Sequence, residues 1–464
     1  MWRPFDIRPL TYLTFWLNEL MNGRDPIGYH AVNVLLHAVA VLLLWAAMRL
    51  LISERAAWIA AAIFAVHPLQ AEPVNYIFAR STTLATLLCL AALFSWARGR
   101  RWWAVVWFGV ALLAKEECVA FPVLLLLIEL WRSRKSSGGR SVLKSALAPI
   151  LTMFGLALAA GVRVLVATSQ IAGSGAGANA GISWKSYGLA QGTVILRYLR
   201  LLVLPWGFTV DPDIAAPSAS LGLLAWAAVT LLVILAAALT WRGREAALWF
   251  LGGLILLLPS SSILPAADLA ADRRLYLPLI GFAAAAGLLL ERLRPAVAVA
   301  VVAVLAILSV ARTETWRTEE SLWQDAASKA PLKVRPKIQL ARAVEPERGI
   351  AILQEAQALA PRDPRVSSEQ GRLYLALGRP DQALMAFGRT LALEPRSADA
   401  YNNRGAALFA LNQKQAARQD FERALAIDPC QFDARLNLQR LGGKIPPGQG
   451  CRYSKEQSKA LGEK

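Results

Sequence analysis

The chain has 464 residues, of which 56% are hydrophobic and only 18% are charged, and its mean hydropathy is +0.41. Soluble globular proteins contain about 45–50% apolar and about 25% charged residues, so the composition excludes a disordered chain or a coiled coil and argues against a wholly soluble enzyme. The net charge of +18 would suit nucleic-acid binding. However, before residue 313 the basic residues form short clusters between apolar runs, which is typical of a membrane protein with no nucleic-acid partner.

Residues 1–29 are predicted to be part of an outer loop, and they lack the continuous apolar core of a cleavable signal peptide. Ten apolar segments follow before residue 313. Because a span needs about 20 apolar residues, residues 30–312 are predicted to form an all-α, polytopic membrane helix bundle of about ten spans. The shorter segments either extend into their flanks or are buried among neighbours. The segments are 30–51, 56–68, 77–97, 102–115, 118–131, 145–167, 219–241, 246–264, 273–290 and 296–312.

The charges between the segments predict an orientation in the bilayer. With strict alternation, one set of loops holds 14 basic residues and the opposite set holds nine. The positive-inside rule assigns the richer set, including 132–144, to the cytoplasm, so both termini are predicted to lie outside. Ten of the 14 acidic residues before residue 312 fall on the outer side. Either acids avoid cytoplasmic loops, or the outer side carries an active surface.

Three polar residues share one face of the first predicted span, and they are His30, Asn33 and His37. Polar groups at membrane depth are costly unless they are satisfied. We favour hydrogen bonds between helices over a metal site. No cysteine or histidine spacing typical of zinc occurs in the chain, so neither a metal nor a cofactor is predicted.

A short outer loop begins at His67 and contains Glu72 between two apolar spans. A desolvated carboxylate has a raised pKa and suits general acid–base catalysis; the alternative is a helix-capping or solvated acid. Arg80, in the next span, would pair with Glu72 or receive a lipid phosphate. Lys115, Glu116 and Glu117 form the tip of a tight outer hairpin. This tip is either a solvated turn, or a place where Lys115 contacts a phosphate while Glu116 orients the lysine.

Asp272, Arg273 and Arg274 begin a later span on the predicted outer side, against the positive-inside trend. Guanidinium groups bind phosphate oxygens in pairs, so an anionic ligand would explain them. The alternative is that their side chains extend to the interface.

The outer loop 168–218 contains an amphipathic segment, Trp184–Trp206, with Arg197 and Arg200 three residues apart. Such a segment is expected to lie in the membrane interface as a helix. Its cations would hold a lipid-linked phosphate or would be attracted to headgroups in general.

Residues 313–441 show a 34-residue period, which is typical of tetratricopeptide repeats. We expect a degenerate repeat at about 330–363, then repeats at 364–397 and 398–431, a capping helix at 432–441 and a mobile tail at 442–464. If this part is exported, an oxidising compartment would allow a disulfide between Cys430 and Cys451; the alternative is two free thiols. The period is carried by Pro361, Pro395 and Pro429, by Gly371 and Gly405, and by Leu353, Phe387 and Phe421.

Several motifs occur in a characteristic order: Arg8-Pro9-Leu10-Thr11, Gly28-Tyr29-His30-Ala31-Val32-Asn33 with Leu35-Leu36-His37, Phe64-Ala65-Val66-His67-Pro68 with Glu72 and Arg80, Leu113-Ala114-Lys115-Glu116, and Asp272-Arg273-Arg274-Leu275-Tyr276-Leu277-Pro278. Trp316 and Leu322-Trp323 then lead into the repeats. This set resembles the transmembrane and tetratricopeptide repeat-containing O-mannosyltransferases and their bacterial relatives, over nearly the whole chain.

The resemblance implies a glycosyltransferase of the GT-C fold in a bacterial inner membrane, with periplasmic repeats. Such an enzyme transfers a sugar from a polyprenyl-phosphate-linked donor to a protein or glycan acceptor. It needs a base for the acceptor hydroxyl and cations for the leaving phosphate. Glu72 or Asp6 would be the base. The residues implied at the donor are Arg80, Lys115, Glu116, Arg197, Arg200, Asp272, Arg273, Arg274 and Tyr276, beside a polar pocket of His30, Asn33, His37 and His67.

The N-terminus departs from the family pattern, in which a further span precedes an acidic residue or pair in the first outer loop. This sequence begins inside that loop, at Met1, and does not show them. Either the start lies further upstream, the chain is a fragment, or catalysis has been lost. The alternative function is a non-catalytic membrane scaffold whose repeats bind partners. A transporter or polymerase is less favoured, because the spans show no inverted internal repeat.

Overall fold

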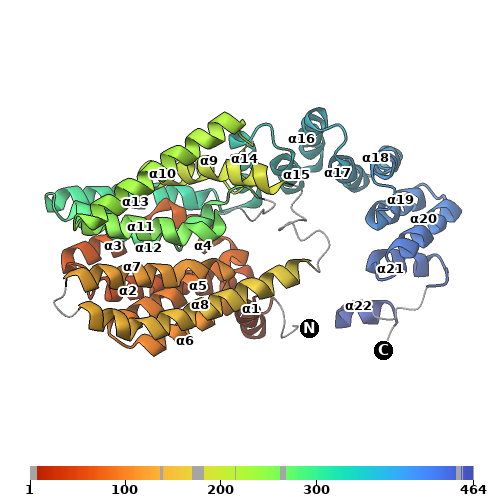
Figure 1. Cartoon of the computed structure of the whole chain (residues 1–464). Coiled ribbons are helices and arrows are strands. Elements are labelled where there is room, and N and C mark those ends of the chain that lie inside the picture. The colour runs from red at the N-terminus through yellow and green to blue at the C-terminus, as the bar shows by residue number, and fades with distance from the viewer. Residues whose placement is uncertain are drawn as a thin grey trace. The chain divides into compact units, whose positions relative to one another are not determined.

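The computed structural model describes residues 8–135, 139–169, 182–214, 216–261, 268–445, 451 and 453–462. These residues form helices and no strand, which confirms the predicted all-α class. The chain divides into two compact units, Met1–Arg317 and Thr318–Lys464. Each unit is described by itself (Figure 1).

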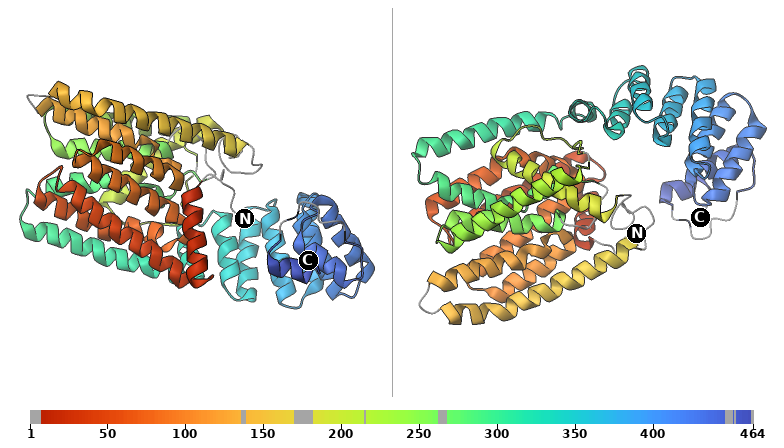
Figure 2. Two further views of the ribbon diagram at one scale, coloured as in Figure 1. Left: turned by 90° about the horizontal axis from the view of Figure 1, so that it is seen from below. Right: turned by 45° about the horizontal axis from the view of Figure 1, so that its top comes forward.

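The first unit is a bundle whose long helices lie side by side and run between its two ends (Figures 1 and 2). Each of the ten predicted apolar segments overlaps one long helix. The helices are α1 (Pro9–Asn22), α2 (Pro26–Met48), α3 (Glu54–Val66), α4 (Ala71–Asn75), α5 (Arg80–Ala97), α6 (Arg101–Ala114), α7 (Phe121–Lys135), α8 (Gly139–Ser169), α9 (Trp184–Val203), α10 (Ala219–Trp241), α11 (Glu245–Leu257), α12 (Leu279–Leu290) and α13 (Pro295–Glu314).

Among the described residues, five helical segments are long and apolar enough to cross a membrane, which indicates a multi-pass membrane protein. In the same part of the chain, three further apolar helices are shorter than a span, including Leu279–Leu290. Nine of the 12 residues of α12 are buried, which agrees with a helix that is apolar all round and packs among neighbours. The five long segments are Pro26–Met48, Ile77–Ala97, Leu143–Ala167, Ala219–Trp241 and Pro295–Glu314.

Small residues let α12 approach its neighbours closely. A Cβ atom on Gly287 would lie 2.4 Å from the backbone oxygen of Ala56 in α3, and one on Gly281 would lie 2.4 Å from the backbone nitrogen of Gly253 in α11. Close backbone approach through small residues is the usual way in which membrane helices pack. These contacts hold α12 between α3 and α11.

The connections gather at two ends of the bundle. At one end, the short helical turns at Pro68–Gln70 and Asp272–Leu275 contact α4 and each other, and the turn at Glu116–Ala120 contacts the turn at Leu258–Ser260. We call it the Glu72 end. The opposite end carries the turns after α2, α5, α10 and α12, and we call it the Trp96 end.

The second unit is a series of helices that stack one after another (Figure 2). The pairs α17/α18 and α19/α20 fall within the two predicted repeats. Gly371 lies against Phe387 and Gly405 against Phe421, where an added Cβ would meet ring atoms at 2.5 Å and 2.7 Å. The helices are α14 (Glu319–Lys329), α15 (Val334–Ala343), α16 (Pro346–Leu359), α17 (Pro364–Ala376), α18 (Pro380–Leu393), α19 (Ala398–Ala410), α20 (Lys414–Ile427), α21 (Phe432–Arg440) and α22 (Lys455–Ala460).

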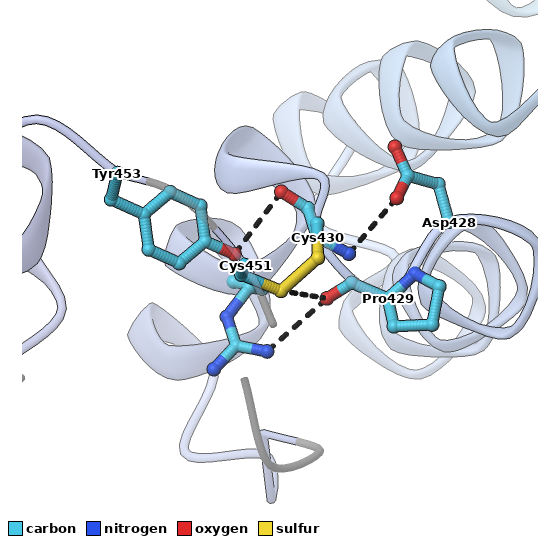
Figure 3. The surroundings of a disulfide bond; sticks show 6 residues. Asp428, Pro429, Cys430, Cys451 and Tyr453 are labelled. Atoms are coloured by element: carbon cyan, nitrogen blue, oxygen red, sulfur yellow. Dashed lines mark hydrogen bonds between the residues drawn. A yellow bond between two sulfur atoms is a disulfide. The ribbon is translucent and has the colours of Figure 1, made fainter. Parts of the chain in front are cut away.

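A disulfide joins Cys430, just after α20, to Cys451 in the tail (Figure 3). The two Cα atoms are 5.2 Å apart. The Tyr453 hydroxyl donates a hydrogen bond to the backbone oxygen of Cys430 at 3.1 Å, and its ring lies 6.0 Å from that of Phe432. Cys451 and Tyr453, within the 442–464 segment that was predicted to be mobile, are therefore joined to the end of the last repeat, and Lys455–Ala460 form the short helix α22.

Candidate active site

The loop that carries Glu72 folds into short helical turns because proline interrupts α3. Pro68 disfavours the helical conformation at the preceding residue, and His67 is extended with φ −65° and ψ 132°. The chain then forms one 3₁₀ turn and the five-residue α4 before α5 begins. Glu72 is the second residue of α4, and only 5% of it is exposed.

Glu72 is bound by a residue 201 positions away in the sequence, Arg273. The Arg273 Nη1 atom lies 2.7 Å from Oε1, and the Arg273 backbone N–H donates to Oε2 at 3.1 Å. Burial raises the pKa of the Glu72 carboxyl above its ordinary value, the charge of Arg273 opposes this rise, and the charge of Asp272 adds to it. The site thus holds a desolvated carboxylate against a partly exposed guanidinium.

Asp272 forms a second buried ion pair beside the first, because Arg197 of α9 binds both of its carboxylate oxygens. The Thr209 backbone N–H also donates to Asp272, at 3.2 Å. The Tyr198 hydroxyl fixes α9 further by donating to the backbone oxygen of Ala271 at 3.0 Å and accepting from its N–H at 2.9 Å. The apolar face of α9, expected to lie in the membrane interface, therefore packs against protein.

The remaining predicted arginines of this region bind backbone carbonyls. Arg274 donates to Asp268 at 2.9 Å and to Leu269 at 3.2 Å. Arg200 donates to Trp206 at 3.4 Å. These bonds shape the loops around Arg273, whose guanidinium also lies 3.8 Å from the Asp268 carboxylate.

The hairpin tip pairs differently from the arrangement that the sequence suggested. Lys115 contacts Glu117, at 2.8 Å, and the Thr82 hydroxyl, at 2.7 Å. Glu116 instead receives two hydrogen bonds from Arg8, at 2.6 Å and 3.1 Å. Burial acts to raise the pKa of Glu116, but the hydrogen bond and charge of Arg8 hold it below its ordinary value.

Arg8 and Glu117 take part in these ion pairs, although neither residue was given a role of its own from the sequence. Arg8 was visible only as part of the first motif, and Glu117 differs from Glu116 by one position on a short turn. The charge of Glu117 also acts to raise the pKa of Arg273 and of Arg274, so the hairpin tip lies at the same end of the bundle as the Glu72 pair.

Arg80 does not pair with Glu72. It donates to the Asn33 side chain at 2.8 Å and to the backbone oxygen of Tyr29 at 2.9 Å, and its guanidinium lies 4.5 Å from the Phe15 ring centroid. Among the described residues no carboxylate forms an ion pair with it, although it is fully buried. An unneutralised buried cation is costly, so this position favours a nearby anion.

The polar residues inside the bundle link helices. His37 lies 3.1 Å from the backbone oxygen of Ala65 and 2.8 Å from the hydroxyl of the fully buried Tyr276. His67 lies 3.2 Å from the backbone oxygen of Leu202. His30 is half-buried in α2 and takes no part in these contacts.

No group of three possible metal ligands occurs in the part of the chain that the structure describes. Asp6, the other predicted base, lies outside the described residues. Seven of the predicted site residues lie at the Glu72 end, and they are Glu72, Lys115, Glu116, Arg197, Asp272, Arg273 and Arg274. Arg80 is hydrogen-bonded to Asn33 instead. Tyr276 is directed into the bundle, where its hydroxyl meets His37.

Two family models match the chain. Residues 8–162 match the dolichyl-phosphate-mannose-protein mannosyltransferases, and this segment contains Glu72, Arg80 and Lys115. Residues 368–430 match the tetratricopeptide repeat. Among solved structures, a thermophilic TPR protein of Thermus thermophilus aligns with 46% of this chain and 97% of its own, at 15% identity and a TM-score of 0.25.

Curated relatives carry the name protein O-mannosyl-transferase. TMTC3 of Mus musculus is 31% identical over 35% of this chain and 21% of its own length. F38B6.6 of Caenorhabditis elegans is 28% identical over 71% of this chain and 49% of its own length, and TMTC4 of Homo sapiens is 25% identical over 71% and 54%. This chain thus spans at most about half the length of these relatives. The resemblance predicted from the motifs is confirmed: the chain is similar to the protein O-mannosyl-transferases, and it combines a segment that matches the mannosyltransferase family with tetratricopeptide repeats.

Proposed function

We propose that this chain is a GT-C-type glycosyltransferase of a bacterial inner membrane. It moves a sugar from a polyprenyl-phosphate-linked donor to an acceptor on the periplasmic side, at the Glu72 end. The observation that carries this proposal is that the segment matching the mannosyltransferase family, 8–162, supplies Glu72 and Lys115 to a surface that is completed by Arg273.

In this proposal Glu72 is the general base that accepts the proton of the acceptor hydroxyl. Its burial favours proton uptake, whereas its ion pair with Arg273 holds it ionised in the resting protein. A donor phosphate offers Arg273 a second anionic partner. When Arg273 turns from Glu72 to that phosphate, the carboxylate is released to act as a base, so donor binding prepares the catalytic group.

The cations of the Glu72 end stabilise the leaving phosphate. Lys115 is held by Glu117 at 2.8 Å, and the charge of Glu117 also acts to raise the pKa of Arg273. Arg80 adds a buried charge that no described carboxylate neutralises. Fixed cations around a developing phosphate anion lower the barrier to transfer without reorganising water.

The repeats are proposed to select the acceptor or a partner protein. Their helix pairs place polar residues such as Gln370 and Asn402 on the first helices of successive repeats.

The test is sugar transfer by the full chain in nanodiscs, with polyprenyl-phosphate mannose as the donor. Glu72→Gln should lower the rate by about 10²–10⁴-fold, which is the contribution of one acid–base group. Glu54→Gln, an exposed acid at the Trp96 end, is the matched control and should leave the rate within twofold. Unchanged transfer in the Glu72 variant would remove this residue from the mechanism.

One observation favours the alternative of a non-catalytic scaffold: Glu72, Glu116 and Asp272 are each bound by an arginine of the same chain. A scaffold would use these pairs only to hold the loops together. The same assay separates the two functions, because a scaffold transfers no sugar with any polyprenyl-linked donor while its repeats still bind a partner.

A further inference from the structure

The Trp96 end contains a cavity of about 600 Å³, far from the residues used above. It lies between the ends of α5, α6, α7 and α11. Its volume is within the range of small-molecule sites, about 300–1,000 Å³. The lining includes the aromatic residues Trp96, Trp131 and Trp249 and the charged residues Arg101, Arg132, Lys135 and Glu245.

The lining carries more positive than negative charge. Arg101, Arg132 and Lys135 face a single lining acid, Glu245. Behind them the buried Glu129 lies 3.6 Å from Arg101 and 3.7 Å from Arg132. Both distances exceed those of a charge-assisted hydrogen bond, about 2.7–2.9 Å. The two guanidinium groups are therefore oriented by Glu129 without being saturated by it.

An independent observation also points to a ligand that accepts hydrogen bonds. The indole N–H of Trp249 is buried and has no acceptor among the described residues. Trp96, by contrast, donates to Glu129 at 2.8 Å. Buried tryptophan N–H groups usually find a partner, so the lining offers one unused donor in addition to its cations.

The surroundings place this cavity at the level of lipid headgroups. Four tryptophans that are more than half exposed surround the same end, and such aromatic belts mark the membrane–water interface. The Arg134 guanidinium lies 3.5 Å from the Trp241 ring centroid, which keeps a cation at that level. The four are Trp58 at 56%, Trp102 and Trp103 at 59% each, and Trp241 at 74% exposure.

We propose that this cavity binds a phosphate-bearing headgroup, supplied by an anionic phospholipid of the leaflet at the Trp96 end. Arg132 and Lys135 contact the phosphate, and Trp249 donates its free N–H to a phosphate or glycerol oxygen. The apolar lining residues Leu51, Ile128 and Leu248 accommodate the first part of the acyl chains. Basic pockets between membrane helices recognise headgroups in this way. The site does not depend on the proposed glycosyl transfer.

The experiment measures lipid binding to the purified full chain in detergent by native mass spectrometry. Phosphatidylglycerol should bind more tightly than phosphatidylcholine. The double variant Arg132→Gln/Lys135→Gln should weaken phosphatidylglycerol binding by about tenfold or more, since each basic residue near a membrane surface contributes severalfold. Trp249→Phe, which removes only the N–H and keeps an aromatic ring, should weaken it severalfold.

The matched control is Arg98→Gln/Arg242→Gln, which removes two exposed charges of the same end that do not line the cavity. It should change the affinity by less than twofold. Equal losses in the two double variants, or none in either, would overturn the proposal. A second experiment measures the binding of glycerophosphate, which carries the headgroup phosphate without acyl chains. If it binds as tightly as the lipid and with the same dependence on Arg132 and Lys135, the cavity is a phosphate site for a soluble ligand, and the proposal of a phospholipid ligand is wrong.

Discussion

Glu72 and Arg273 form a buried ion pair in which each partner needs the other. Glu72 is 5% exposed and Arg273 is 26% exposed at its side chain. Removing one partner leaves a desolvated charge, which costs about 3–5 kcal/mol in buried pairs. We expect Arg273→Gln to lower the thermal stability of the detergent-solubilised chain by about 3 kcal/mol, and Glu72→Gln/Arg273→Gln to recover much of it.

The control for this prediction is Arg317→Gln, because the Arg317–Glu314 pair is exposed, at 80% and 64% of the two side chains. It should leave the unfolding temperature nearly unchanged. Equal destabilisation by Arg273→Gln and Arg317→Gln would contradict a special role for the buried Glu72–Arg273 pair.

The pH dependence of activity should report on Glu72. Burial raises the pKa of this carboxyl above 4.5, and a base acts only when it is unprotonated. We therefore expect the acid limb of kcat/KM for sugar transfer to lie above pH 4.5, with activity falling as the pH drops through the raised pKa. In Glu72→Gln the residual activity should lose this limb. If the fall of activity at low pH persists in Glu72→Gln, the titrating group is another acid and not Glu72.

Glu116 and Glu117 are adjacent in the sequence but differ in their partners. Glu117 holds Lys115, whereas Glu116 holds Arg8 at the start of α1. We expect Glu117→Gln to raise KM for the lipid-linked donor, because Lys115 loses its orientation. Glu116→Gln should instead increase hydrogen exchange in α1 with a smaller change in KM. Equal effects of the two variants on KM would contradict this division.

At the scale of elements, α12 depends on close backbone contacts. Because a Cβ at Gly287 would lie 2.4 Å from the Ala56 backbone oxygen, Gly287→Ala should destabilise the bundle by about 1–3 kcal/mol, as overpacked sites do. Gly155 in α8 has no atom within 4 Å of an added Cβ, so Gly155→Ala should be neutral or slightly stabilising. Thermal unfolding of the two variants in one detergent checks the difference.

The positions of the helices could be predicted well from the sequence. The residues and helices that each of them contacts could be predicted less well. Apolar runs predict helices without further knowledge, and the repeats are fixed by glycines that meet phenylalanine rings 16 residues later. The surroundings of α9 could not be predicted, because an apolar face is equally suited to lipid and to protein. The pairing of Arg197 with Asp272 joins positions 75 residues apart, a distance at which local patterns carry no information.

At the scale of the whole molecule, the disulfide limits how the chain end can unfold. Cys430 and Cys451 are 21 residues apart, and closing a loop of about this length is worth about 3 kcal/mol in the chain-entropy model. Cys430→Ser/Cys451→Ser should therefore release α22 and speed proteolysis of the tail in the full chain. The membrane part should keep its digestion pattern, and faster digestion there would point to general unfolding.

The orientation in the bilayer is a second property of the whole molecule. A reporter fused at residue 400 should be active outside the cytoplasm, since strict alternation of the predicted spans places both termini there. A reporter in the turn at 98–100 should be active inside. Activity of the 400 fusion in the cytoplasm would contradict the proposed site of transfer.

The ion pair between α4 and the Asp272–Leu275 turn also sets a limit on how this protein can be divided. The stretch that matches the mannosyltransferase family ends at residue 162, yet the cation that binds its central acid comes from residue 273. A shortened protein that stopped within α8 would retain the matched stretch and lose the neutralising guanidinium. The matched stretch is therefore not a portable module, and fusions or truncations that aim to keep it intact must extend through α12.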